Sequence, residues 1–338
     1  MFRINNNEAD IKENDIREQY PEVLETLLRD HTTQQNIFWA TENYHYLGES
    51  YAFAAQILPE LITGDKGNII MPRVQKDKEM QQSRVRDMAE VFTPSWICNA
   101  QNNLIDNAWF GRESVFNTEI SNADGSHSWT VNYEKITFPE GKTWKHYVRD
   151  TRLEMTCGEA PYITSRYDTT TGEFIPIEKR IGLLDRKLRV ISENVDKSDE
   201  WLEAAQSAYR NTYAFEWQGD SLLLAREAML YTFIENYEQK FGKQPLLKSI
   251  QYIAYIISWN VWQMDGLKGV VPNSCGDRKT FVEELFGEKE IVTACEGCKS
   301  DNIHKHNGVY CLIKDWNNKD TETNKKGRKL KFIDLLKK

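Results

Sequence analysis

Three stretches of the chain repeat one pattern, in which a short apolar run ends in a carboxylate and a turn follows. The first stretch is Leu153–Tyr162 (LEMTCGEAPY), which reads as a strand turning into a helix. The second runs from Tyr213 to Glu216. The third is the apolar segment 246–264, which is followed by Asp265. A glycine in such a turn lets the backbone approach a ligand, and a helix start offers free N–H groups. Alternating strands and helices with acids at the strand ends predict an α/β domain whose ligand lies at the carboxyl edge of a parallel sheet.

The regions before and after these three stretches differ from them in sequence pattern. Residues 1–65 carry apolar side chains at helical spacing in two segments, which predicts helices. We therefore expect an N-terminal helical region over residues 1–87, an α/β domain over 88–275 and a small C-terminal Cys/His module with a basic tail over 276–338. A length of 338 residues suits one large domain with appendages or two domains.

A cofactor that contains an adenosine needs three groups from such a sheet. These are a glycine loop after the first strand, an acid at the end of the next strand for the ribose hydroxyls, and a group near the adenine amine. Gly158, Glu216 and Asp265 occur in that order. Glu216 follows Gly158 by many more than the roughly 20 residues of a compact dinucleotide-binding fold. Either residues 163–197 are an insertion and Glu216 binds the ribose, which we favour, or Asp185 is the ribose ligand.

Three motifs of the chain resemble the S-adenosylmethionine-binding motifs of adenine-specific DNA methyltransferases, in the branch whose Thr-Pro motif precedes the cofactor loop. The motifs are Glu90-Val91-Phe92-Thr93-Pro94, Leu153-Glu154-x-x-Cys157-Gly158, and Tyr213-x-Phe215-Glu216 followed by Leu224-Ala225-Arg226. The run from about Phe38 to Asp315 is similar to bacterial proteins labelled restriction endonuclease subunit M. Thr93 before Pro94 is also a favourable helix start, because the hydroxyl can cap the first turn and proline suits its first position.

This resemblance implies a Rossmann-like methyltransferase fold that binds S-adenosylmethionine. It also implies DNA as a partner, together with a restriction or specificity protein. The cofactor residues that it implies are Phe92, Thr93 and Pro94 at the methionine end, Glu154, Thr156, Cys157 and Gly158 in the loop, Glu216 at the ribose and Asp265 near the adenine ring.

The sequence departs from the family pattern at two places. The second glycine of the loop is replaced by Ala160, which is followed by Pro161. The catalytic motif of adenine methyltransferases is Asn, Asp or Ser, then Pro-Pro and an aromatic residue that stacks on the flipped base. No such tetrapeptide occurs in the chain, and the Val271–Cys275 segment does not fit it. The catalytic residue is therefore unknown.

Three functions are compatible with these motifs. The first is transfer of a methyl group to adenine in DNA, in a restriction-modification or related defence system. The second is a non-catalytic subunit that binds S-adenosylmethionine or DNA and needs a partner protein for activity. The third is methylation of another substrate, with Asp265 or residues 271–275 in a different role. An assay of methyl transfer to DNA with and without partner proteins separates the three.

A cluster of Cys and His residues near the end of the chain is a candidate zinc site. Cys295 and Cys298 form a CxxC pair, and a zinc ion needs two further Cys or His ligands a short distance away. We predict Cys311 as the third ligand and either His304 or His306 as the fourth. A closed site with four protein ligands would be structural rather than catalytic. The alternative is a surface hairpin with reduced cysteines.

Composition narrows the class of protein. The net charge of −8 argues against a general polyanion binder, although basic residues are concentrated in 73–86 and 319–338. The chain has no apolar run of eighteen residues and no apolar signal segment at its start, so we predict a cytoplasmic protein without a membrane span. The aromatic stretch 36–46 predicts either a packing patch or a partner-binding or base-stacking surface.

Overall fold

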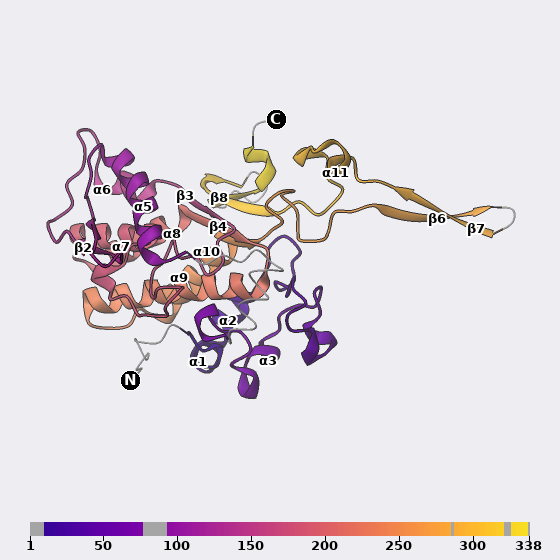
Figure 1. The fold of residues 1–338 in the computed structure, drawn as a ribbon, viewed down its shortest axis with the longest axis horizontal. Helices are drawn as coiled ribbons and strands as arrows, with labels where there is room; N and C mark the ends of the chain where they lie inside the picture. The colour runs from indigo at the N-terminus through magenta and orange to yellow at the C-terminus, as the bar shows by residue number, and fades with distance from the viewer. Residues whose placement is uncertain (1–9, 77–92, 285–286, 321–325, 337–338) are drawn as a thin grey trace.

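The computed structural model describes residues 10–76, 93–284, 287–320 and 326–336. Within these ranges the chain is a mixed α/β protein, as the sequence predicted, and a two-stranded hairpin extends far from it (Figure 1). None of the helices in the described ranges combines the length and the apolar composition that crossing a membrane requires.

A three-stranded parallel sheet lies at the centre of the fold. Its strands are β3 (Arg152–Met155), β4 (Thr212–Glu216) and β5 (Val261–Gln263), in the order β3-β4-β5. Each strand is the apolar run of one of the three repeated stretches, so the three predicted strand ends lie at one edge of one sheet. Beyond β3, however, the chain forms turns instead of the helix that the sequence predicted, and the next α-helix begins at Leu183.

Helices connect the strands and cover one face of the sheet. The connecting helices are α7 (Leu183–Asn194) and α8 (Ser198–Arg210) between β3 and β4, and α9 (Gly219–Phe241) and α10 (Leu247–Asn260) between β4 and β5. Ala214 of β4 and Val261 of β5 face these helices and belong to the main hydrophobic core. The opposite face packs Phe215 and Trp262 into a smaller core with Cys311, Ile313 and Phe332.

The N-terminal region shares the main core. Its helices are α1 (Glu13–Gln19), α2 (Pro21–Leu28) and α3 (Pro59–Ile62). α2 packs against α9 and α10, and the buried guanidinium of Arg226 in α9 donates to the carbonyl oxygen of Leu27. In the aromatic stretch, Trp39 and Tyr44 are buried in this core, which agrees with the packing reading, whereas Tyr46 is exposed.

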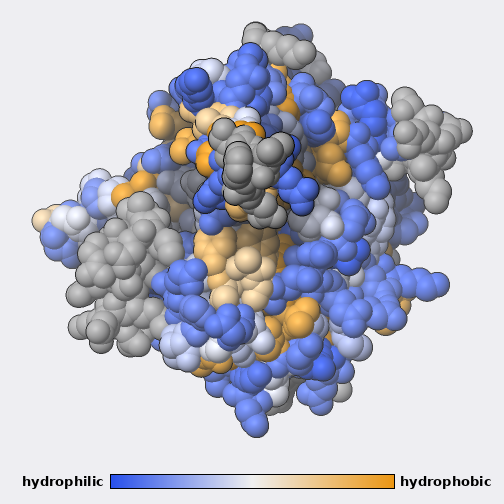
Figure 2. All heavy atoms as spheres, turned by 90° about the vertical axis from the view of Figure 1, so that its right-hand side faces the viewer, coloured by the Kyte–Doolittle hydropathy of each residue, from blue (hydrophilic) through white to orange (hydrophobic). Residues whose placement is uncertain are grey.

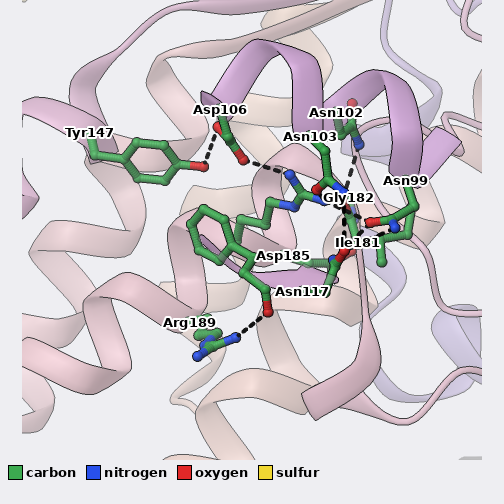
Figure 3. A network of polar contacts seen from close by, with 12 residues as sticks. Asn99, Asn102, Asn103, Asp106, Asn117, Tyr147, Ile181, Gly182, Asp185 and Arg189 are labelled. Atoms are coloured by element: carbon green, nitrogen blue, oxygen red, sulfur yellow. Dashed lines mark hydrogen bonds and ion pairs between the residues drawn. The ribbon is translucent and has the colours of Figure 1, made fainter. Parts of the chain in front are cut away.

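A buried polar network holds α5 (Ser95–Phe110) to α7 (Figure 3). Arg186 of α7 donates to Asp106 Oδ2 at 2.6 Å and to the side-chain oxygens of Asn99 and Asn103 at 2.9 and 2.8 Å. The Tyr147 hydroxyl donates to the other carboxylate oxygen of Asp106, Oδ1, at 2.9 Å. Because Arg186 and Tyr147 pair with Asp106, Asn99 and Asn103, α5 can bury a polar face.

The remaining elements lie outside the sheet. They are the hairpin β1 (Asn117–Ser121) with β2 (His127–Val131), helix α6 (Trp144–Arg149), the hairpin β6 (Arg278–Glu284) with β7 (Gly287–Thr293), helix α11 (Glu296–Ser300) and the hairpin β8 (Leu312–Lys319) with β9 (Lys326–Lys331). Short 3₁₀ helices occupy His45–Leu47, Glu49–Tyr51, Gly64–Lys66, Arg73–Gln75, Ile177–Lys179, Ile303–Lys305 and Phe332–Leu335. We call β6 and β7 the arm. Figure 2 looks at the side from which the arm projects and shows an apolar area below it among hydrophilic residues.

Candidate metal centre and strand-end site

Four side chains at the base of the arm form a compact cluster of metal-binding atoms. They are Cys275, Cys295, Cys298 and His306, and their ligand atoms all lie within 4.8 Å of one another. Cys275 Sγ lies 3.3 Å from Cys295 Sγ, 3.5 Å from Cys298 Sγ and 3.3 Å from His306 Nδ1. Sulfur atoms around a tetrahedral zinc ion, at Zn–S distances of about 2.3 Å, lie roughly 3.8 Å apart. The four atoms are thus spaced nearly as such a site requires.

The arm itself brings the ligands together. Cys275 precedes β6 and Cys295 follows β7, and the register of the hairpin pairs Arg278 with Thr293 at its base. Cys298 lies on the short helix that starts after Cys295. Gly297 lets His306 approach, because a Cβ atom at this glycine would lie 2.5 Å from the His306 backbone nitrogen and 2.6 Å from Nδ1.

The surroundings of two of the sulfurs differ. N–H groups of Cys298 and Asn307 point at Cys295 Sγ, the latter at 3.4 Å, and they lower the pKa of Cys295 to about 6. Burial and the neighbouring sulfurs raise the pKa of Cys275 to about 11. A cation bound here would replace the thiol protons and offset the repulsion between the negatively charged sulfur atoms. The Cys₃His group could hold a structural metal ion, and its donor set suits zinc.

The cluster differs from the ligand set expected from the sequence. It contains Cys295, Cys298 and His306, but Cys275 stands in place of Cys311. Cys311 lies in the smaller core and its thiol donates to the Gln263 carbonyl oxygen at 3.4 Å, so it faces the sheet. His304 is not part of the cluster either, and its buried Nε2 has no hydrogen-bond partner in the described structure. Cys275 is not among the ligands predicted from the sequence, because it lies 20 residues before Cys295 and meets it only through the β6–β7 hairpin.

The loop after β3 forms the second candidate site, at the carboxyl edge of the sheet. Three of its alternate residues, Thr156, Gly158 and Ala160, have φ values of 52°, 53° and 59°. This left-handed region favours glycine and is unfavourable for a β-branched threonine. Ala160 therefore adopts a backbone conformation that glycine favours. Backbone strain of this kind clusters at functional sites.

Glu216 ties this loop to the next strand. Its Oε2 accepts the Gly158 N–H at 2.8 Å, and its Oε1 accepts the N–H groups of Trp217 at 2.8 Å and Gln218 at 3.3 Å. Burial raises the pKa of Glu216, and these three backbone N–H groups oppose that rise. A carboxylate offers about four acceptor positions, so about one remains for a ligand.

Glu154 lies beneath the same loop with one oxygen unused. Its Oε1 accepts the Tyr162 N–H at a long 3.4 Å, while its Oε2 is buried and has no hydrogen-bond partner among the described residues. Burial, together with the charge of Glu216, raises the pKa of Glu154 to about 8. At neutral pH Glu154 is thus mainly protonated and can donate a hydrogen bond.

The other predicted cofactor residues lie around this loop. Thr93 and Pro94 precede α5, whose Asn102 donates to the Tyr162 carbonyl oxygen at 3.0 Å, whereas Phe92 lies outside the described residues. The buried Cys157 N–H donates to the Phe215 carbonyl oxygen at 2.9 Å.

The two other candidate acids have different surroundings. Asp265 lies at the end of β5, where its Oδ1 accepts the N–H groups of Leu267 at 3.0 Å and Lys268 at 3.2 Å. Asp185, the alternative ribose ligand, lies in the first turn of α7 and accepts the Ser165 N–H at 2.8 Å, away from any strand end. Glu216 and Asp265 thus share the carboxyl edge of the sheet with the glycine loop, and Asp185 does not.

A scan against protein-family models and searches of curated proteins and of solved structures found no match to this chain. The function therefore has to be argued from the two candidate sites and their chemistry.

Proposed function

We propose that the chain binds S-adenosylmethionine at the carboxyl edge of its parallel sheet and takes part in methylation of adenine in DNA, within a restriction-modification or related defence system. The observation that carries the proposal is the pair of acids under the strained loop. Glu154 has a buried oxygen without a partner, and Glu216 bonds Gly158 with about one acceptor position to spare. A buried polar atom without a partner calls for an explanation, and a bound ligand is the explanation that we propose for Glu154 Oε2.

The residues present fit the cofactor. Glu216 would accept a ribose hydroxyl, Asp265 would lie by the adenine ring, and Thr93 and Pro94 would lie at the methionine end. The loop at Thr156, Cys157 and Gly158 would pass close to the cofactor. When bound, S-adenosylmethionine supplies an electrophilic methyl group. The chain's own residues would bind and orient it.

A specific observation favours a non-catalytic role for this chain on its own. The sequence contains no Asn, Asp or Ser followed by Pro-Pro and an aromatic residue. A methyltransferase needs a group that hydrogen-bonds the amine of the flipped base. In this second candidate function the chain is the cofactor-binding subunit of a complex, and methyl transfer requires a partner protein.

We also propose zinc as the ion of the Cys₃His group. Four protein ligands leave no open coordination position, so the ion would stabilise the base of the arm and take no part in methyl transfer. DNA remains the proposed nucleic-acid partner.

Calorimetric titration of S-adenosylmethionine into the purified chain tests the proposal. We expect binding that Glu216→Ala weakens tenfold or more, about 1.4 kcal/mol. Glu154→Ala should also weaken binding, since it removes the carboxyl group with the unused oxygen. Glu203→Gln, on the exposed face of α8, is the matched control and should bind as the wild type does. Absence of binding by the folded wild type, also with DNA present, would contradict the proposal.

A further inference from the structure

The six cysteines of the chain lie in two settings, three apart from the Cys₃His group and three within it. The three outside the group are buried, and burial raises the pKa of each of these thiols, for Cys98 to about 12. Buried, protonated thiols are inert, because the thiolate is the form that reacts. Within the group, by contrast, Cys298 is exposed to solvent. Exposed cysteine sulfur is therefore confined to the base of the arm.

Cys298 meets both conditions that favour oxidation of a cysteine. It lies on α11 at the base of the arm (Figure 1), where its neighbours Lys299 and Ser300 are exposed as well. A bound zinc ion would keep its sulfur ligands deprotonated, so Cys298 would present a thiolate to solvent. Susceptibility to oxidation follows thiolate character and exposure. A small oxidant such as hydrogen peroxide can thus reach this sulfur without entering a core.

Cys275 supplies the second sulfur that a disulfide needs. Its Sγ lies 3.5 Å from Cys298 Sγ and 3.3 Å from Cys295 Sγ. A disulfide bond is about 2.0 Å long, so Cys275 and Cys298 need only a small approach to form one. Cys295 is buried, and the Asn307 N–H points at its sulfur at 3.4 Å. The half-buried Cys275 is therefore better placed to react with Cys298 than Cys295 is.

We propose that the Cys₃His group is a peroxide-sensitive switch, in which hydrogen peroxide joins Cys275 to Cys298 in a disulfide and thereby expels the metal ion. The inference rests on the proposed zinc ion and adds a regulatory role to its structural one.

Two steps account for the atoms and electrons. Cys298 Sγ attacks one oxygen of the peroxide, the O–O bond breaks, and the other oxygen leaves as water after it takes a proton from solvent. Cys275 Sγ then attacks the sulfur of the resulting sulfenic acid, the S–S bond forms, and the hydroxyl group leaves as a second water with another solvent proton. The two sulfurs together lose two electrons, and the peroxide gains them.

The disulfide changes what holds the base of the arm. It leaves Cys295 and His306 as ligands, and two ligands are too few for a closed zinc site. Because Cys275 precedes β6 and Cys298 follows β7, the new bond still joins the two ends of the arm. Oxidation thus exchanges a removable ion for a covalent link, and a thiol reductant reverses the exchange.

Oxidation of the purified, zinc-loaded full chain tests the switch. Hydrogen peroxide would be added in the presence of 4-(2-pyridylazo)resorcinol, whose absorbance reports released zinc. We expect release of about one equivalent per chain, and peptide mapping should find a disulfide between Cys275 and Cys298. The cysteines outside the group should stay reduced, and dithiothreitol with added zinc should restore the bound ion.

A ligand exchange isolates the exposed sulfur. Cys298→His keeps four zinc ligands but removes the exposed thiolate, so we expect peroxide to release zinc at least tenfold more slowly than from the wild type. Cys311→Val changes a cysteine outside the group and should release zinc at the wild-type rate. If Cys298→His takes up no zinc, the peptide map of the wild type decides.

Three results for the wild type would overturn the inference. They are zinc that stays bound while peroxide oxidises glutathione in the same solution, a disulfide that lacks Cys275 or Cys298, and sulfinic acids that dithiothreitol does not reduce. Equal release from the wild type and Cys298→His would overturn it as well. A chain that takes up no zinc loses the proposed ion and the switch together, whereas a chain that holds zinc through peroxide treatment keeps the ion and loses only the switch.

Discussion

The body of the molecule and its arm are stabilised in different ways. The body, α1 to α10 with the sheet β3 to β5, buries apolar side chains of the N-terminal region, the sheet and the helices in one continuous core. The arm extends away from the body (Figure 1) and exposes Phe281, Val282, Ile291 and Val292, and none of its described side chains belongs to a hydrophobic core. A lone two-stranded hairpin is marginally stable in water. The comparison teaches that burial in a core stabilises the body, whereas the extension buries little and has a cluster of candidate metal ligands at its base.

The largest expected effect concerns the ligand that the sequence did not indicate. Cys275→Ser removes one of four ligands, so we expect the purified protein to lose its bound zinc, from one equivalent to nearly none. Cys311→Val is the matched control, because Cys311 faces the smaller core, and it should keep the full equivalent. Elemental analysis by mass spectrometry measures both. Loss of zinc in the Cys311 variant alone would restore the ligand set expected from the sequence.

A second test removes the central cation of the polar network in the body. Arg186→Met leaves the buried Asp106 without its 2.6 Å ion pair, and breaking a buried pair typically costs about 3–5 kcal/mol. Urea unfolding should show this loss while the zinc content stays unchanged. Lys197→Met removes the exposed pair with Glu200 and should have little effect. A small effect of Arg186→Met would mean that the network does not stabilise the body.

A third test concerns a buried acid pair between α1 and α9. Glu13 and Glu227 are both buried, and their carboxyl oxygens have no hydrogen-bond partners in the described structure. Burial raises the pKa of Glu227 well above 4.5, and the charges of Glu13 and Asp10 raise it further. The folded state therefore keeps a proton that the unfolded state releases, so this contribution to stability is complete below pH 4.5 and is lost as pH rises.

Glu227→Gln removes this pH dependence. We expect the variant to be as stable as the wild type near pH 4 and more stable at pH 8. The difference at pH 8 should be about 1.4 kcal/mol for each unit by which folding raises the pKa of Glu227, counted up to that pH. Unfolding by urea at several pH values measures the difference. If the free energy of unfolding depended on pH in the same way in the variant and the wild type, this would contradict the burial of an unpaired carboxyl group at Glu227.

The smallest expected effect lies in the loop after β3. Thr156→Gly removes the strain of a β-branched residue at φ 52°, which should stabilise the chain by up to about 1 kcal/mol after the entropy cost of glycine. Thr156→Ala keeps a side chain at the same angle and should stabilise less. Thermal unfolding compares the two. A stabilised Thr156→Gly variant that binds S-adenosylmethionine more weakly would link the strain to the proposed site.

The sequence predicted the elements that depend on local patterns. Helices of the N-terminal region and the strand-end acids Glu216 and Asp265 lie where periodicity and turn signals placed them. The pair of Cys295 and Cys298 was also found, because a CxxC spacing is local. The mixed α/β class is confirmed, while the finer Rossmann-like methyltransferase fold remains a proposal.

Features that depend on distant residues could not be read from the sequence. Cys275 joins the cluster because a hairpin folds it back onto Cys295, and no local spacing distinguishes it from Cys311. The predicted helix after β3 is absent because the chain there alternates into left-handed residues before Pro161. Pairing of Arg186 with Asp106 likewise requires α5 and α7 to meet.

Hydrogen exchange with and without a zinc chelator tests the contrast between body and arm most directly. The account predicts that amides of residues 275–310 lose protection when zinc is removed, while those of α9 and α10 keep theirs. Equal loss of protection in α9 and α10, or an arm that stays protected without metal, would contradict it.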